Sequence, residues 1–234
     1  MPDVITPSSL GLVPDTAAAS TSTVELPVSG SGRRLYELTK RSIDIAATAS
    51  GMLLLAPLFA LVALAIRIDS PGPVLFSQTR VGKDGTTFRC WKLRSMFVDA
   101  EARKEALLVE NEMQGGVLFK MKRDPRITRV GRFIRKASID ELPQLWNVLV
   151  GDMSLVGPRP AVPAEVSQYT PYERLRLSVK PGITCFWQVS GRSDLPFDEQ
   201  VRLDIHYARA RSLVVDISLL FRTVPAVLFA RGAY

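Results

Sequence analysis

The stretch Ile45-AATASGMLLLAPLFALVALA-Ile66 decides how this chain is organised, because its twenty-two residues carry no charge. An α-helix rises about 1.5 Å per residue, so this stretch is long enough to cross the roughly 30 Å apolar layer of a bilayer once. However, Pro57 lies in its middle, where a proline removes a backbone hydrogen bond and bends a helix. Each arm is then about a dozen residues long, which is too short to span.

Basic residues flank the apolar stretch on both sides. The positive-inside rule therefore places both ends on the cytoplasmic side. A re-entrant membrane helix over residues 35–69, bent at Pro57, satisfies this demand, and a single-pass anchor is the alternative. The flanking cations are Arg33, Arg34, Lys40 and Arg41 before the stretch and Arg67, Arg80 and Lys83 after it.

The remaining chain divides into two expected parts. Residues 1–34 are rich in Ser, Thr, Pro, Ala and Gly, so we expect a disordered N-terminal segment that is not a signal peptide. Residues 70–234 are expected to form a cytoplasmic domain. Cys90 and Cys185 lie far apart without metal-ligand spacing, which favours a reduced compartment.

Composition favours a membrane-associated globular protein with anionic partners. Apolar residues make up 47 % of the chain, and the net charge is +7. That charge suits nucleic acid, lipid headgroups or a phosphorylated substrate, and it does not choose between them.

Local patterns predict an α+β fold that is mostly helical. Val74–Phe76 and Thr86–Trp91 flank a glycine-containing turn and predict a small β-hairpin. Residues 183–189 are expected to be a strand or loop. Residues 213–229 predict either an amphipathic helix in the membrane interface or a helix packed on the core. Further helices are expected over residues 100–114, 163–179 with a break at Pro171, and 197–211.

Two adjacent acids, Asp140 and Glu141, are the leading candidates for chemistry. They precede a short helix expected between Pro143 and Gly151, and the positive end of a helix favours carboxylates and attracts phosphate. The alternative is structural, because Ser138-x-x-Glu141 also fits a capping box.

Cations surround these acids in the sequence. Residues 123–136 contain six Arg or Lys against one acid, and arginines that recur at every third position cannot share one helical face. We expect several of them to converge on an anion. Arg159 is held between Pro158 and Pro160, and the alternation of Lys92 and Arg94 predicts two cations on one strand face. A carboxylate pair among cations suits metal-assisted phosphoryl chemistry.

Six motifs in order resemble the bacterial sugar transferases, the monotopic polyprenyl-phosphate phosphoglycosyl transferases. The likeness begins near residue 37 and continues to the end of the chain. The family commonly has Ser-Pro at the helix break, whereas this chain has Ala56-Pro57. The motifs are Lys40-Arg-Ser-Ile-Asp44, Phe76-Ser-Gln-Thr-Arg-Val-Gly82, Lys92-Leu-Arg-Ser-Met96, Ser138-Ile-Asp-Glu-Leu-Pro-Gln144, Leu155-Val-Gly-Pro-Arg-Pro160 and Lys180-Pro-Gly-Ile-Thr184 with Trp187-Gln-Val-Ser-Gly-Arg192.

The resemblance implies an enzyme that transfers hexose-1-phosphate from a UDP-sugar to undecaprenyl phosphate and releases UMP. This would be the first membrane step of exopolysaccharide or O-antigen synthesis. By resemblance, Asp140 is the covalent nucleophile, and Mg²⁺ bridges the Asp140 and Glu141 carboxylates and the diphosphate. The cations carried over as phosphate and nucleotide contacts are Lys92, Arg94, Arg135, Arg159 and Arg192.

The same resemblance implies a protein of the bacterial inner membrane with its catalytic domain on the cytoplasmic face, and it is compatible with a homodimer. A non-enzymatic scaffold that binds anionic lipid is the alternative. Such a scaffold would not need the acid pair. A nucleic-acid binder would not need residues 45–66, and the sequence lacks a base-reading signature, so nucleic acid is not an expected partner.

Overall fold

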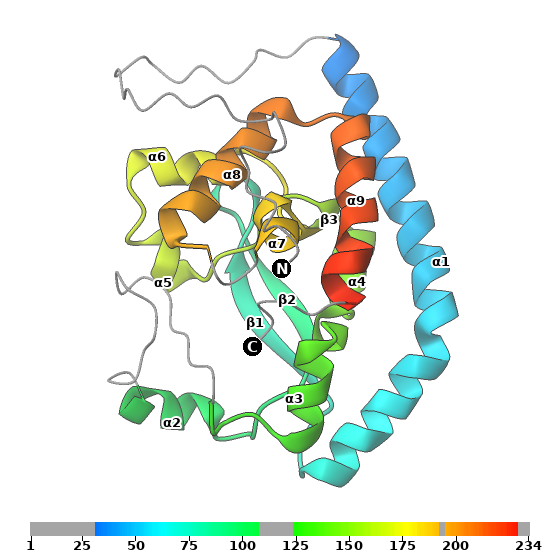
Figure 1. Ribbon diagram of the computed structural model, residues 1–234, viewed down its shortest axis with the longest axis vertical. Coiled ribbons are helices and arrows are strands. Elements are labelled where there is room, and N and C mark those ends of the chain that lie inside the picture. The colour runs from blue at the N-terminus through cyan, green and yellow to red at the C-terminus, as the bar shows by residue number, and fades with distance from the viewer. Residues whose placement is uncertain (1–30, 108–123, 192–194, 229–234) are drawn as a thin grey trace, which may run out of the picture.

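A computed structural model describes residues 31–107, 124–191 and 195–228. Its first element, α1 (Ser31–Asp69), is one helix of 39 residues with Pro57 inside it. The helix lies along one side of the molecule and bends part-way, so that it partly encloses the other elements (Figure 1). Helix α1 is continuous through Pro57, so the proline does not end the helix, and the re-entrant hairpin itself stays a prediction.

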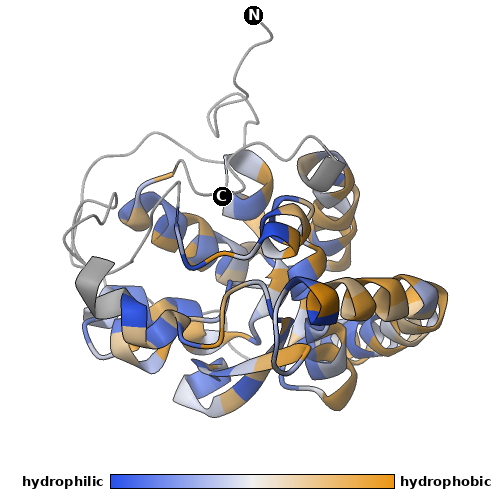
Figure 2. Cartoon of the chain, turned by 90° about the horizontal axis from the view of Figure 1, so that it is seen from below, coloured by the Kyte–Doolittle hydropathy of each residue, from blue (hydrophilic) through white to orange (hydrophobic). Residues whose placement is uncertain are grey.

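Among the described residues, α1 is the one helix that is long and apolar enough to cross a membrane. Little of its apolar part is buried within the protein, since Leu53 and Leu54 are each 80 % exposed. In the view of Figure 2, a long helix at the side of the molecule is mostly orange, as the charge-free residues 45–66 of α1 require. An exposed apolar surface of this extent is typical of contact with lipid or with another protein.

Both ends of α1 are attached to the same body of the protein. Near its start, the Arg41 guanidinium donates to the carbonyl oxygens of Val148 and Leu149 at 2.5 and 2.8 Å. One turn later, the Asp44 carboxylate accepts a hydrogen bond from the Leu155 amide at 3.1 Å. The start of the helix is thereby fixed by residues more than a hundred positions away.

The other end of α1 is fixed by apolar packing. Val62 and Ile66 are buried against Leu93 and Ile134, from a strand and a helix of the domain. The exposed middle of α1 thus lies between two attached ends.

The predicted β-hairpin is confirmed. Strands β1 (Leu75–Val81) and β2 (Thr87–Leu93) pair antiparallel in a register that runs from Leu75 opposite Leu93 to Val81 opposite Thr87. A turn that contains the short helix η2 (Lys83–Gly85) connects them. Gly85 has φ +83°, a backbone conformation in which glycine carries no steric cost.

A second, parallel pair of strands joins distant parts of the chain. Strand β3 (Ser154–Val156) pairs with β4 (Gly182–Thr184), with Ser154 opposite Gly182 and Val156 opposite Thr184. The elements between the hairpin and β3 are α2 (Ala100–Leu107), α3 (Arg129–Lys136), η4 (Ile139–Glu141) and α4 (Gln144–Val150). The expected helix 100–114 is described only as far as Leu107.

After β3 the chain forms shorter helical segments than the sequence pattern predicted. Helices α8 (Phe197–Ala210) and α9 (Leu213–Leu228) are confirmed. The helix expected over 163–179 begins at Pro163 and is broken before Pro171, as predicted, but its parts are short and residues 175–178 form a 3₁₀ helix. They are α5 (Pro163–Val166), α6 (Pro171–Arg174) and η5 (Leu175–Ser178); residues 183–189 add the unpredicted α7 (Phe186–Ser190) after β4.

The largest apolar core cluster lies where α7, α8 and α9 meet β3. Tyr207 and Leu219 are buried there, and the free Cys185 thiol packs against them. Helix α9 contributes one face to this core, while Val214 and Phe221 on it are more than 70 % exposed. Helix α9 therefore packs on the core, which was one of the two predictions. It also presents an apolar face outward.

Candidate functional site

The two predicted acids lie in η4, between α3 and α4, as the sequence indicated. Asp140 is only 7 % exposed. Ser138, just before η4, adopts the left-handed conformation with φ 57°, which costs a non-glycine residue on the order of 1 kcal/mol. The Ser138 side chain caps no helix, so the capping-box alternative is wrong. The backbone turn at Ser138 instead directs the acids inward.

Glu141 is held by two cations from different elements. Its Oε1 accepts from the Lys92 Nζ at 2.7 Å and from the Arg159 Nη2 at 2.6 Å, and its Oε2 accepts from the Arg159 Nη1 at 3.2 Å. The arginine therefore grips both oxygens, the bidentate arrangement that fixes the orientation of both partners. Lys92 comes from β2 and Arg159 from the loop after β3, so this carboxylate joins three parts of the chain.

Close backbone contact positions Arg159. The amide of Gly157 donates to the Thr184 carbonyl, and the amide of Gly182 donates to the Pro158 carbonyl, both at 2.9 Å. A Cβ on Gly182 would fall 2.0 Å from the Gly157 nitrogen, so only glycine fits there. The segment Gly157-Pro-Arg-Pro160 is thus fixed to β4 directly before it delivers the guanidinium.

Asn147 fixes the helix after the acids to the strand that carries Lys92. Its side-chain oxygen accepts from the Trp91 amide at 3.0 Å, and its Nδ2 donates to the Arg89 carbonyl at 2.7 Å. Asn147 is buried, and these bonds connect α4 to β2. The sequence analysis missed this residue, although a polar side chain within the apolar run of α4 was an available signal.

Burial and neighbouring charges shift the pKa values of the two acids in opposite directions. Burial, and then the negative charge of Glu141, raises the pKa of Asp140 to about 6. Burial alone would also raise the pKa of Glu141, but Arg159 and Lys92 outweigh burial and hold that pKa well below its usual range. Two neighbouring carboxyls with displaced pKa values are typical of sites that give the two groups different roles.

Arg80 is a further basic residue near this pair, to which the sequence analysis assigned no role in the site. It donates to the Pro160 carbonyl at 2.9 Å and to the Gln78 side-chain oxygen at 2.7 Å. Within the described part of the chain it bonds to no carboxylate. Burial, and then the charge of Arg159, lowers the pKa of Arg80. A partly buried cation beside another cation is a place where an anion is favoured. Its position in the motif Phe76–Gly82 was the available signal.

A family model of bacterial sugar transferases matches residues 35–230, which include all the elements described above except the first four residues of α1. The chain belongs to the bacterial sugar transferase family. The predicted resemblance is confirmed.

Individual relatives agree with this assignment. Galactosyl transferase CpsE of Streptococcus agalactiae serotype III (strain NEM316) is 49 % identical over 197 residues, 84 % of this chain and 43 % of the relative. UDP-glucose:undecaprenyl-phosphate glucose-1-phosphate transferase of Escherichia coli (strain K12) is 40 % identical over 218 residues, 90 % of this chain and 44 % of the relative. The chain thus spans less than half the length of both relatives.

A third relative has nearly the same extent as this chain. Exopolysaccharide production protein ExoY of Rhizobium meliloti (strain 1021) is 37 % identical over 208 residues, 88 % of this chain and 92 % of the relative.

Two of the five cations predicted to bind substrate in this sugar transferase, Lys92 and Arg159, contact Glu141 directly. Arg135 acts through charge, since it lowers the pKa of Asp140 against the effect of burial. Arg192 lies outside the described residues. The convergence expected of residues 123–136 is only partial, because Arg126 is paired with the buried Asp124 at 2.7 Å.

Arg94 has a structural position and does not join the acids. Its guanidinium is buried and donates to the carbonyls of Pro71 and Ser70 at 2.7 and 2.6 Å, just past the end of α1. A cation at the end of a helix satisfies carbonyl groups that have no partner in the helix. These bonds place Arg94 away from the acids, so the predicted contact of Arg94 with phosphate stays untested, and sequence alternation does not show what a side chain meets.

The acid pair of this sugar transferase fits a magnesium ion that Asp140 and substrate phosphates hold together. The described residues contain no cluster of three or more Asp, Glu, His or Cys side chains that would hold a metal alone. Mg²⁺ is commonly bound by one or two carboxylates together with substrate phosphates, so such a cluster is not required. Asp140 accepts no hydrogen bond from Lys92 or Arg159, whereas Glu141 accepts from both. Asp140 is therefore the better ligand of the two.

Proposed function

We propose that this chain transfers hexose-1-phosphate from a UDP-sugar to undecaprenyl phosphate and releases UMP. The observation that carries the proposal is the pairing of Asp140, buried with a raised pKa, with Glu141, which is locked between Lys92 and Arg159. The printed name of the Escherichia coli relative describes this reaction for glucose, which supports the same class of reaction here.

In the first step, a carboxylate oxygen of Asp140 attacks the β-phosphorus of the UDP-sugar. The bond from that phosphorus to the bridging oxygen breaks, and the electron pair leaves with UMP. The sugar phosphate is then bound covalently to Asp140. In the second step, an oxygen of undecaprenyl phosphate attacks the same phosphorus and releases the Asp140 carboxylate. The products are UMP and the undecaprenyl-diphosphate sugar.

The cations make the approach of one anion to another possible. Arg80 has no carboxylate partner among the described residues, so it is available to the diphosphate. Lys92 and Arg159 are held by Glu141 at fixed positions before substrate arrives. Positive groups that are already in place stabilise charge that develops in the transition state without further reorganisation. Glu141 is therefore a positioning residue in this scheme, and Asp140 is the catalytic residue.

Mg²⁺ is part of the proposal. Asp140 and the diphosphate oxygens would hold it, and the bound ion would neutralise charge on the reacting phosphates. Glu141 is less suited as a ligand because its oxygens already accept three hydrogen bonds.

The attachments of α1 support a re-entrant placement in the bacterial inner membrane. Arg41 at one end and Ile66 at the other both contact the domain, while Leu53 and Leu54 between them are exposed. If the middle of the helix enters a bilayer, both ends must stay on the side where the domain lies. A single-pass anchor would separate one end from its contacts. The flanking cations favour the cytoplasmic side.

The non-enzymatic scaffold explains less of the structure. Lipid binding needs the exposed apolar helix and surface cations, but it does not need a carboxyl buried beside a second carboxylate. Burial of such a pair lowers stability, so its presence favours a chemical role.

The test uses purified full-length protein, a panel of UDP-sugars and Mg²⁺, first without undecaprenyl phosphate. We expect about one equivalent of UMP per protein and a mass increase equal to one hexose phosphate, followed by turnover when the lipid is added. Asp140→Asn should lose both signals, with UMP release reduced at least about a thousandfold. Retention of the mass increase by that variant, or UMP release only in the presence of lipid, would contradict the covalent step.

A further inference from the structure

An open apolar groove lies between the second half of α1 and helix α3, which are neighbours at one end of the molecule (Figure 1). Its volume is about 480 Å³, within the range of roughly 300–1,000 Å³ that is usual for ligand pockets. Three residues of α1 and four of α3 line it, and neither Asp140 nor Glu141 is among them. The groove is therefore separate from the acid pair.

Contacts between the two helices fix the shape of the groove. The Asp69 carboxylate at the end of α1 accepts a hydrogen bond from the Val130 amide in the first turn of α3, at 2.9 Å. Val62 of α1 and Ile134 of α3 are the buried residues of the lining, and they pack in one apolar cluster. The groove is thus present before any ligand binds.

The rims of the groove are apolar and exposed. Leu61 on α1 and Phe133 on α3 both line it, and each is 67 % exposed. A hydrocarbon chain between these two side chains would remove their apolar surface from water, which is favourable. The groove therefore suits the chain of a lipid.

Arg129 brings a positive charge to this apolar lining, and among the described residues of the groove it is the one that is charged. It is the first residue of α3, where the positive end of the helix dipole disfavours a cation. Its exposed side chain forms no hydrogen bond or ion pair with any described residue. The fold does not account for this arginine, whereas an anionic lipid headgroup would complement it.

The exposed face of α3 carries more positive charge. Arg129, Arg132, Phe133 and Lys136 have the spacing i, i+3, i+4, i+7, which places them on one face of a helix, and all four are exposed. The side chains of Arg132 and Lys136 also have no ion-pair partner in the described part of the chain. Basic residues around an exposed aromatic ring are typical of helices that bind an anionic membrane surface.

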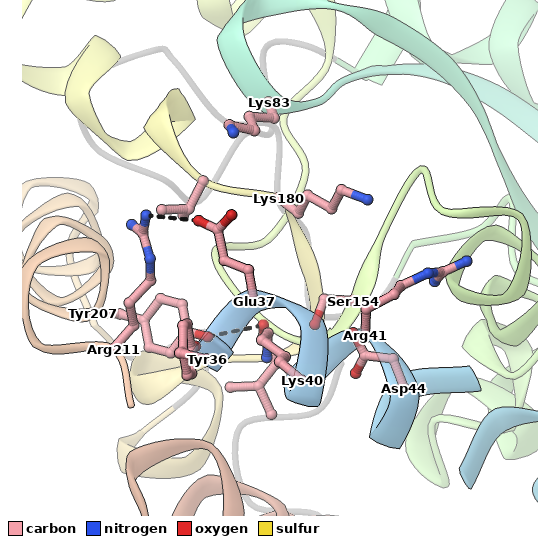
Figure 3. Close-up of a pocket in the computed structure, with 12 residues that line it drawn as sticks. Tyr36, Glu37, Lys40, Arg41, Asp44, Lys83, Ser154, Lys180, Tyr207 and Arg211 are labelled. Carbon is pink, nitrogen blue, oxygen red and sulfur yellow. Dashed lines mark hydrogen bonds and ion pairs between the residues drawn. The ribbon is translucent and has the colours of Figure 1, made fainter. Parts of the chain in front are cut away.

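The pocket at the first turns of α1 has a different chemistry (Figure 3). Seven of the twelve residues that line it are charged, and Arg211 and Glu37 approach each other there at 3.8 Å. A hydrocarbon chain that covered these groups would cost their hydration. The groove beside α3 is therefore the better site for a lipid chain.

We propose that the groove between α1 and α3 binds an anionic glycerophospholipid, with one acyl chain between Leu61 and Phe133 and the headgroup phosphate against the Arg129 guanidinium. Arg132 and Lys136 add to the attraction for anionic headgroups from the same helical face. The inference goes beyond the proposed reaction, and it rests only on the contact of α1 with lipid.

The acceptor of the proposed reaction fits the groove less well. Arg129 is the first residue of α3, and the acids follow its last residue, Lys136. Eight helical residues rise about 12 Å, so a phosphate on Arg129 would lie at the opposite end of α3 from the carboxyl with which it must react. The groove thus suits a lipid that stays bound and is not consumed.

The first test counts the lipids bound to the purified full-length protein by native mass spectrometry in detergent, with phosphatidylglycerol or phosphatidylcholine added in steps. We expect phosphatidylglycerol to bind about tenfold more tightly, because it adds a charge-assisted contact. Arg129→Gln should lose this preference, and Arg129→Lys should retain most of it. Arg209→Gln removes one charge from an exposed position on α8 and should behave like the wild type.

Two results of this test overturn the proposal. One is equal affinity of the wild type for the two lipids. The other is a preference for phosphatidylglycerol in Arg129→Gln that equals the preference in Arg209→Gln, since the charge at the groove would then have no special effect.

The second test blocks the groove from α1. Ala65→Phe places a ring in the lining and should weaken phosphatidylglycerol binding at least about tenfold, the effect of excluding two methylene groups. Ala63→Phe adds the same ring to α1 outside the lining and should bind like the wild type. Equal binding by these two variants places the lipid elsewhere and overturns the proposal.

Circular dichroism and the thermal midpoint show whether both variants fold. If Ala65→Phe does not fold, Phe133→Ala at the exposed rim replaces it. This variant should weaken binding about threefold through the loss of apolar contact with the chain. Wild-type affinity in Phe133→Ala would likewise overturn the proposal.

Undecaprenyl phosphate and a second copy of the chain are the other occupants to be tested. Displacement of phosphatidylglycerol by an equal amount of undecaprenyl phosphate would assign the groove to the acceptor. A dimer that is lost in Ala65→Phe and kept in Ala63→Phe would assign it to a second copy. Either result overturns the proposal. Because bound lipid is counted and UMP release is not measured, this failure is distinguishable from failure of the proposed reaction.

Discussion

Gly182 lies so close to Gly157 that a Cβ atom on Gly182 would be 2.0 Å from the Gly157 nitrogen. This contact fixes the loop that carries Arg159. Gly182→Ala should therefore destabilise the protein by about 1–3 kcal/mol, the usual cost of overpacking, and should reduce UMP release by more than its effect on folding. Denaturant unfolding and UMP release measure the two effects.

Gly51→Ala is the matched control for that substitution. No atom lies within 4 Å of the position of its Cβ, and the residue is inside α1. Alanine should be neutral or stabilising there by up to about 1 kcal/mol. Equal losses in the two variants would contradict the role assigned to the contact between Gly157 and Gly182.

The pH dependence of kcat/KM should show an acid limb near pH 6. Asp140 must be ionised to attack, and its pKa is raised to about 6, so activity falls as the pH drops through that value. In Glu141→Gln the negative charge that helps to raise this pKa is gone. The limb should therefore move to lower pH, while the maximal rate falls because Arg159 and Lys92 lose their shared partner. If the acid limb stays at the same pH in Glu141→Gln, it does not report the ionisation of Asp140.

The same raised pKa predicts how stability depends on pH. The folded state holds a proton on Asp140 more tightly than the unfolded chain, so this group stabilises the fold at acidic pH, and its contribution is lost as the pH rises through about 6. Asp140→Asn should consequently show a smaller loss of unfolding free energy than the wild type between pH 5 and pH 7.

Arg80→Gln should weaken UDP-sugar binding by about tenfold or more, since one charge-assisted contact to the diphosphate is lost. Folding should change little, because both groups bonded to Arg80 are neutral oxygens and no ion pair is broken. Arg89→Gln, another arginine of the same hairpin, is the comparison, and it should bind UDP-sugar as the wild type does. Isothermal titration in the Asp140→Asn background avoids turnover. Equal affinities in the two variants would remove Arg80 from the site.

Removal of divalent metal should stop UMP release. We expect EDTA to abolish turnover and added Mg²⁺ to restore it, because the diphosphate must be neutralised before a carboxylate can approach it. The far-ultraviolet circular dichroism spectrum serves as the control and should not change. Full activity after chelation would contradict the proposed magnesium site.

The topology of α1 can be tested by cysteine labelling. Leu38 is exposed before the apolar stretch and Asp84 is exposed after it, whereas the native Cys90 and Cys185 are buried. Leu38→Cys and Asp84→Cys should both react with an impermeant reagent only from the cytoplasmic side. In Pro57→Leu the helix loses its bend, so we expect a mixed population in which some chains expose residue 38 to the periplasm. Periplasmic labelling of residue 38 without the proline substitution would restore the single-pass anchor.

The sequence predicted those features that depend on local pattern. The hairpin, α8 and α9 follow from alternation and helical periodicity, and the acids precede α4 where a short apolar helix was expected. The start at Pro163 and the break at Pro171 were predicted, since proline is favoured at the first helical position, but the shortness of the helices that follow them was not.

Features that depend on tertiary contacts were not predictable. Lys92 and Arg94 are two residues apart, yet one contacts Glu141 and the other satisfies carbonyls after α1. Arg80 and Asn147 gain their roles only when the hairpin meets α4 and the loop after β3. No local pattern gives those distances, since the residues involved are more than fifty positions apart in the sequence.

The attachments at the start of α1 also impose an order on biosynthesis. Lys40 bonds to Asp216, and Asp44 bonds to the Leu155 amide, so the partners of this helix are made long after the helix itself has left the ribosome. At about 5–20 residues per second, Asp216 follows Lys40 by roughly 10–35 seconds. During that interval the apolar helix has no protein surface to complete its docking, and the lipid bilayer or a chaperone must shield it from aggregation.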